Sequence, residues 1–191
     1  LTRAEYDRTI TALFGFESHW GAEFTAEVVE HGFDNQSDGL TVTPLLAGQL
    51  QKAAEAIAAK AVVDAFGAVV PCEPESAGCD EQFVASFGQR AFRRPLTDED
   101  VARYLALFDL GDADGFAAGV ELVVSAMLQS PHFVYRSELG AVGDDAYELT
   151  AWEIASQLSY LVWGTMPDEE LFAGAADGTL KDADVRQKQL V

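Results

Sequence analysis

Hydrophobic residues recur three and four positions apart along most of the chain, a spacing that predicts amphipathic helices. In the first segment they fill one face until Gly15 ends the run: Tyr6, Ile10, Leu13 and Phe14. Comparable runs occupy residues 43–66, 80–94, 97–110, 116–129, 131–136 and 150–163, and two short acidic stretches follow Pro167. No segment alternates strongly enough to predict a strand. The pattern therefore predicts an all-α fold, an irregular multi-helix bundle of about seven to nine helices.

Residues typical of helix starts precede several of these runs. Thr2, Thr97 and Thr150 each stand three positions before an acidic residue, the spacing of a capping box. Thr43 and Ser130 each precede a proline, which favours an N-cap followed by the first helical position. These signals place helix boundaries independently of the hydrophobic pattern.

The helical periodicity disappears between residues 19 and 42, which predicts one long irregular loop. We interpret residues 1–71 as an N-terminal helical module and residues 80–140 as an arginine-rich helical module. Residues 146–191 are interpreted as the start of a further, truncated helical module. We expect the three modules to pack as one compact unit.

The predicted helix over 150–163 is apolar on nearly all sides, so we expect it to be central. Trp152, Tyr160 and Trp163 fall close to one face of it. Such a face could stack against a glycan, but core packing is the simpler interpretation.

Acidic residues outnumber basic ones by 32 to 12, giving a formal net charge of -20. This balance repels phosphate backbones and anionic lipids, so we expect no nucleic-acid binding. No apolar run reaches the roughly 20 residues needed to cross a bilayer, and we expect no membrane insertion by this segment. The chain starts at Leu1 and its last residues resemble an incomplete helix. We therefore expect a segment of a longer protein.

Cys72 and Cys79 are the only cysteines, and they bracket a short loop rich in small and turn-forming residues. This arrangement favours a disulfide in an oxidising compartment over two free thiols. It indicates an exported protein, located in the periplasm, at the cell surface or outside the cell. The spacing suits neither zinc nor c-type haem attachment, so we expect no haem within this chain.

Three of the twelve basic residues cluster at the predicted end of one helix: Arg90, Arg93 and Arg94. Guanidinium groups bind carboxylates bidentately, so the cluster could hold an anionic ligand or a sugar acid. The alternative is a structural ion-pair network with the acidic residues at 98–100, reinforced by the negative end of the helix dipole. The sequence favours the structural alternative.

His132 and Arg136 lie in the next arginine-containing segment and are further candidates for ligand binding. A helix start favours neutral imidazole, which can ligate a metal or lie at a haem edge, whereas a partly buried histidine bonded to backbone is the simpler interpretation. Asp34 and Asp38 resemble half of a calcium loop, but Leu45 stands where an EF-hand needs glutamate. A looser calcium site and a turn bonded to its own backbone both remain open.

Three groups of segments together carry a family resemblance: 1–15 with the turn at 32–35, 87–97 with 130–136, and 149–170. Nearly the whole chain resembles the N-terminal half of a planctomycete-type family of exported multi-module proteins. Its modules are domains of unknown function, often fused to a c-type cytochrome domain. The resemblance implies haem c in a fused domain and, as partners, the remaining domains of the same parent protein and a c-type cytochrome.

These observations lead to three functional hypotheses. The first is a structural or interaction scaffold for a fused redox or polymer-handling assembly. The second is part of an extracellular enzyme that acts on polysaccharide or another polymer, and the third is a calcium-stabilised binding module. The family resemblance supplies no catalytic residues, and residue spacing selects none, so the sequence leaves open whether the chain is an enzyme.

Overall fold

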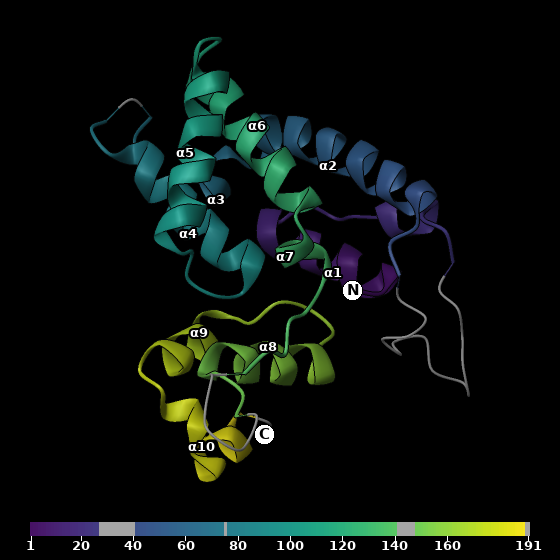
Figure 1. Cartoon of the computed structure of the whole chain (residues 1–191), viewed down its shortest axis with the longest axis vertical. Helices are drawn as coiled ribbons and strands as arrows, with labels where there is room; N and C mark the ends of the chain where they lie inside the picture. The colour runs from purple at the N-terminus through teal and green to yellow at the C-terminus, as the bar shows by residue number, and fades with distance from the viewer. Residues whose placement is uncertain (27–40, 75, 141–147, 190–191) are drawn as a thin grey trace.

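The structure is a computed structural model that describes residues 1–26, 41–74, 76–140 and 148–189. These residues form ten α-helices and two 3-10 helices and contain no strand, which confirms the predicted all-α fold (Figure 1). The elements are α1 Arg3–Phe14, η1 Trp20–Glu23, α2 Pro44–Asp64, α3 Phe66–Val69, α4 Cys79–Phe92, α5 Asp98–Asp112, α6 Phe116–Gln129, α7 Pro131–Val134, α8 Ala151–Val162, α9 Glu169–Ala176, η3 Thr179–Lys181 and α10 Ala183–Lys188.

Five helices begin where the sequence predicts. Thr2, Thr97 and Thr150 each accept a hydrogen bond from the backbone of the third helical residue, whose carboxylate in turn accepts from the threonine backbone. These are three complete capping boxes. Thr43 and Ser130 are N-caps whose side chains accept backbone hydrogen bonds, and a proline follows each. Local side-chain chemistry therefore determines where these helices begin.

The main core is formed around α6, which packs against both α2 and α5 (Figure 1). Its buried side chains are Val120, Val123, Val124, Met127 and Leu128. Two glycines allow α5 and α6 to approach closely. A Cβ on Gly111 would lie 2.8 Å from the Cα of Gly119, and a Cβ on Gly119 would lie 2.9 Å from the Phe108 ring. Larger residues at these two positions would push the helices apart.

The helices α8, α9 and α10 gather at one end of the molecule (Figure 1). They bury a small second cluster, consisting of Ala151, Ala155, Leu171, Ala175 and Leu180. The expectation that α8 is central was wrong, because its end is open to solvent: Leu161 is 81% exposed and Trp163 is 47% exposed. The helix is apolar on several sides because Trp152 packs against the main core, while other residues of α8 contact α9.

Part of the predicted irregular stretch 19–42 is ordered on α1. The short helix η1 lies there, and the carboxylate of Asp7 accepts hydrogen bonds from the Ser18 hydroxyl at 2.6 Å and from the Gly21 amide at 3.1 Å. A Cβ on Gly21 would lie 2.5 Å from the carbonyl oxygen of Arg3, so only glycine fits this contact. Residues 27–40 lie outside the described part of the chain.

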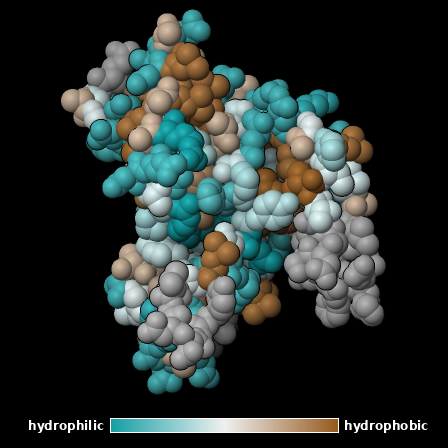
Figure 2. Space-filling model, in the orientation of Figure 1, coloured by the Kyte–Doolittle hydropathy of each residue, from teal (hydrophilic) through white to brown (hydrophobic). Residues whose placement is uncertain are grey.

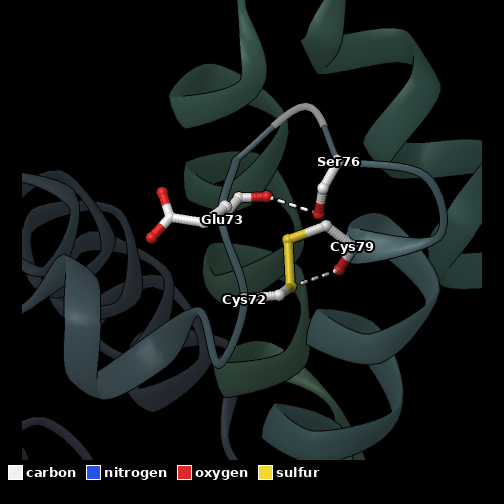
Figure 3. The surroundings of a disulfide bond; sticks show 4 residues. All are labelled: Cys72, Glu73, Ser76 and Cys79. Atoms are coloured by element: carbon white, nitrogen blue, oxygen red, sulfur yellow. Dashed lines mark hydrogen bonds between the residues drawn. A yellow bond between two sulfur atoms is a disulfide. The ribbon is translucent and has the colours of Figure 1, made fainter.

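The predicted disulfide is present. Cys72 and Cys79 are bonded, with their Cα atoms 5.7 Å apart (Figure 3). Cys79 is the buried first residue of α4, and Cys72 lies in the connection that leaves α3. Within the loop, the Ser76 hydroxyl donates to the carbonyl of Glu73 at 2.7 Å (Figure 3). The bridge therefore ties the connection after α3 to the start of α4.

Replacing both cysteines, as Cys72→Ser with Cys79→Ser, is expected to lower the free energy of unfolding by about 2–3 kcal/mol, because the unfolded chain gains the freedom of the opened loop. The measurement is urea unfolding followed by circular dichroism. Treatment with a reductant provides the control, since it should shift the wild-type midpoint toward that of the variant and leave the variant unchanged. Identical midpoints for the oxidised wild type and the variant would contradict the prediction.

Candidate functional site

Arg93 combines an unusual backbone conformation with a buried charged side chain. It follows α4 as its C-cap with φ of 59°, and it is the only non-glycine residue with positive φ in the described part of the chain. The left-handed conformation costs an L-residue about 1 kcal/mol. The residue is also only 3% exposed. Strong contacts must therefore hold a buried cation in this conformation.

The Arg93 guanidinium binds the end of α7. Its Nη2 atom donates to the carbonyl oxygens of His132 at 2.7 Å, Phe133 at 3.0 Å and Tyr135 at 2.8 Å. Because a helix end leaves carbonyl groups without intrahelical partners, this side chain supplies donors for acceptors at the end of α7, including that of the buried Phe133. Arg93 thus joins the end of α4 to the end of α7.

A directed chain of hydrogen bonds continues from Arg93 into α8 and α1. The Arg93 Nη1 atom donates to the hydroxyl of Tyr160 at 3.5 Å, and that hydroxyl lies 2.8 Å from the Thr9 hydroxyl. Thr9 donates its own proton to the carbonyl of Glu5 at 2.7 Å. Since a hydroxyl has one proton, Tyr160 must donate to Thr9. We call Thr9, Arg93 and Tyr160 the polar junction.

The two neighbouring arginines have different partners. Arg90 donates to the carbonyls of Ala68 at 2.9 Å, Ala12 at 3.2 Å and Leu13 at 2.8 Å, which lie near the ends of α3 and α1. Arg94 donates to Asp100 at 3.2 Å. Arg94 is therefore the member of the cluster that pairs with the acidic segment 98–100. Arg90 and Arg93 bind backbone carbonyls, a role that the charge pattern did not suggest.

Asp100 is 5% exposed and accepts from the backbone of Thr97 as well as from Arg94. Burial opposes its ionisation, but hydrogen bonds with the backbone and hydroxyl of Thr97 and with Arg94 outweigh burial. The pKa of Asp100 is therefore below its ordinary value. Its ionised form stabilises the start of α5.

His132 is exposed on α7, and its ring centroid lies 5.3 Å from that of Phe92. Partial burial and then the nearby Arg94 lower the pKa of His132, which favours neutral imidazole, while Asp100 opposes them. No group of three or more potential metal-ligating residues occurs in the described part of the chain. Asp34 and Asp38, the calcium candidates, lie outside the described residues.

A cleft of 720 Å³ lies beside the polar junction, between α1, the segment after α7, α8 and the C-terminal helices. The Arg136 guanidinium lies over the Tyr160 ring, 4.9 Å from its centroid, and 3.7 Å from the Glu5 carboxylate. Lys181 and Arg186 also line the cleft. Sequence reasoning identified Arg136 but missed Lys181 and Arg186, because only the folded chain brings residues so far apart in sequence together.

The three aromatic residues predicted to share one face of α8 have different surroundings. Tyr160 is buried in the junction, whereas Trp163 is 47% exposed. The Trp152 ring packs against Phe172, with a centroid distance of 6.1 Å. They do not form one stacking surface.

Three protein-family models match successive parts of the chain. They are PSD3, a protein of unknown function (DUF1587), over residues 1–63; PSD5, a protein of unknown function (DUF1595), over residues 79–138; and PSD4, a protein of unknown function (DUF1592), over residues 149–191. No curated protein and no solved structure is similar enough to this chain to match it.

Fold and family matches together define an all-helical protein assembled from successive domains. The three domains are those of the planctomycete-type family that the sequence resembles. The polar junction takes Thr9 from the first domain, Arg93 from the second and Tyr160 from the third. In the described residues, no helix is both long and apolar enough to span a membrane.

Arg93→Ala is expected to lower the free energy of unfolding by about 3 kcal/mol, because it leaves three carbonyl oxygens at the end of α7, including the buried one of Phe133, without this donor. Arg94→Ala is the matched control. It removes the same charge and one partly exposed ion pair, so it should cost less than about 1 kcal/mol. Denaturant unfolding of the two variants measures the difference. Equal losses would show that Arg93 contributes only its charge.

The lowered pKa of Asp100 predicts an acid-sensitive contribution to stability. A carboxyl group with a lower pKa in the folded state stabilises the protein above its unfolded pKa of about 3.9, and this contribution is lost as pH falls through the folded pKa. Asp100→Asn should therefore lower stability at neutral pH and reduce the loss below about pH 4. Asp109→Asn, an exposed change on the same helix, is the control. Parallel pH profiles for the wild type and Asp100→Asn would contradict the prediction.

Proposed function

We propose that this chain is a structural and interaction scaffold within a larger exported protein. The observation that carries the proposal is the polar junction, in which one side chain from each of the three domains meets the others. A scaffold must hold its parts in one arrangement, and buried directional hydrogen bonds specify an arrangement more strictly than apolar contacts do.

Further contacts support the proposal that the third domain has a fixed position on the first. The Arg8 Nε atom donates to the Gly164 carbonyl at 3.1 Å, and the Thr165 hydroxyl donates to the Arg8 carbonyl at 3.2 Å. These bonds join α1 to the turn that follows α8, the helix that contains Tyr160. The position of the third domain on the first thus depends on several oriented polar contacts, and neighbouring modules would be held at defined positions relative to it.

The disulfide and the surface support an exported location. Structural disulfides persist in oxidising compartments. Hydrophilic residues cover much of the face shown in Figure 2, as expected for a solvated acidic protein. By family resemblance, the neighbours that the scaffold serves are the remaining domains of its parent protein, including a c-type cytochrome or a polymer-handling module, with haem c in the fused domain.

The cleft beside Tyr160 favours a second candidate function, part of an extracellular enzyme acting on polysaccharide or another polymer. It combines a volume of 720 Å³ with arginine, lysine and glutamate side chains, which are able to bind polar groups of a substrate. The two candidates differ in what the junction is for: in the scaffold it positions neighbouring domains, and in the enzyme it shapes the cleft.

Tyr160→Phe tests the scaffold. The change removes one hydroxyl and keeps the ring, so hydrogen exchange should accelerate at least about fivefold in α8 and α9 while α2 and α6 keep their protection. Mass spectrometry after deuterium labelling measures each segment. Tyr135→Phe, which removes a hydroxyl that accepts from the Val42 amide outside the junction, is the control. Unchanged exchange in α8 and α9 would contradict the proposal that the junction holds the third domain.

A second measurement tests whether the complete polypeptide contains a fused haem domain. In the complete natural polypeptide, the visible absorption spectrum should contain the bands of haem c. Tyr160→Phe should leave these bands intact while loosening the haem domain relative to this chain, measured as a change in small-angle scattering. A complete polypeptide without haem absorption would overturn the redox part of the proposal.

A further inference from the structure

The cleft has a charge composition unlike that of the whole chain. Equal numbers of basic and acidic residues line it, although the chain has 32 acidic and only 12 basic residues. The basic residues are Arg136, Lys181 and Arg186, and the acidic residues are Glu5, Glu138 and Glu148. A quarter of all the cationic side chains of this protein therefore lie around one cleft.

Two of these cations are held in place by contacts at the cleft wall. Arg136 lies over the Tyr160 ring and near Glu5, whose other carboxylate oxygen already accepts from the Thr2 amide at 2.8 Å. Arg186 donates through Nη1 to the carbonyls of Leu180 at 2.9 Å and Lys181 at 2.8 Å. Both guanidinium groups are thus positioned before any ligand binds, which lowers the entropic cost of binding.

Lys181 has a different environment. Within the described ranges, its ammonium group forms no hydrogen bond or ion pair with another residue, and the residue is exposed at the cleft. Glu138 and Glu148 line the same cleft, and among the described residues neither forms an ion pair with Lys181 or Arg186. Arg186 binds the backbone of Lys181, and Arg136 lines the same cleft, so all three cationic side chains border the space that a carboxylate would occupy.

Apolar side chains of α8 form part of the cleft wall. Ile154, Leu158 and Leu161 lie four and three positions apart on α8, so they fall on one face of the helix. Leu161 is 81% exposed, an unusual degree for leucine. This face would gain from contact with a hydrocarbon or aromatic body.

We propose that this cleft binds a small organic carboxylate with an apolar body. The carboxylate lies between Arg136, Lys181 and Arg186, and the apolar body packs on the exposed leucine face of α8. The volume of 720 Å³ is within the usual range for small-molecule sites, about 300–1,000 Å³. This inference goes beyond the scaffold role, because the scaffold concerns the junction and this site concerns the side chains that face the cleft; both use the same position of the third domain on the first.

Isothermal titration calorimetry with phenylacetate tests the site at physiological salt, where the charge of the rest of the protein is screened beyond about 8 Å. Phenylacetate should bind, whereas phenylacetamide and phenethylamine, which keep the ring and lose the negative charge, should bind at least about tenfold more weakly. Glucuronate, which keeps the carboxylate and replaces the ring with a polar sugar, should also bind more weakly.

Two matched lysine variants locate the site. Lys181→Gln should weaken phenylacetate binding by about tenfold, and Lys188→Gln, the same charge change at an exposed residue of α10, should have no effect. Both variants should unfold at the wild-type temperature, because neither lysine supports the core. Leu161→Ser should weaken phenylacetate and leave glucuronate unchanged.

Four outcomes would overturn the proposal: no binding of phenylacetate, equal binding of phenylacetamide, tighter binding of phenethylamine, or equal losses in the two lysine variants. Tighter binding of glucuronate than of phenylacetate would overturn the apolar part of the ligand assignment. The hydrogen-exchange result for Tyr160→Phe is independent of all these outcomes, so failure of this site is distinguishable from failure of the scaffold.

Discussion

The structure depends on one buried cation that has backbone carbonyls as its main partners. The Arg93 guanidinium lies at 3% exposure and satisfies acceptors at the end of α7, while reaching Tyr160 on α8. A buried charge is costly unless its hydrogen bonds are complete. The same requirement explains why Arg93 adopts a left-handed backbone conformation, because this conformation ends α4 where the side chain can reach α7.

Several arginines of this acidic protein bind carbonyl groups at or near helix ends. Arg90 binds carbonyls near the ends of α1 and α3, and Arg186 binds carbonyls of η3. Helix ends carry partial negative charge and unpaired acceptors, so a guanidinium group with five donors suits them better than lysine does. A chain with only 12 basic residues thus uses several of them to connect helices.

The polar junction and the cleft share Tyr160. The hydroxyl of Tyr160 belongs to the junction, and the Arg136 guanidinium lies over the Tyr160 ring at the cleft. Because one residue forms part of both, the arrangement that holds the third domain on the first also creates the cleft wall. The proposed scaffold role and the proposed carboxylate site therefore both depend on the contact between the third domain and the first, although different side chains are responsible for each.

The sequence alone determined the features that depend on nearby residues. The helix starts at Thr2, Thr97 and Thr150 and the disulfide between Cys72 and Cys79 involve partners only a few positions apart, so spacing identified them. The tertiary structure decided the partners of Arg90 and Arg93, the exposed end of α8 and the meeting of Arg136 with Lys181 and Arg186. These depend on backbone carbonyls and on packing between distant helices, and neither leaves a signature in residue type or spacing.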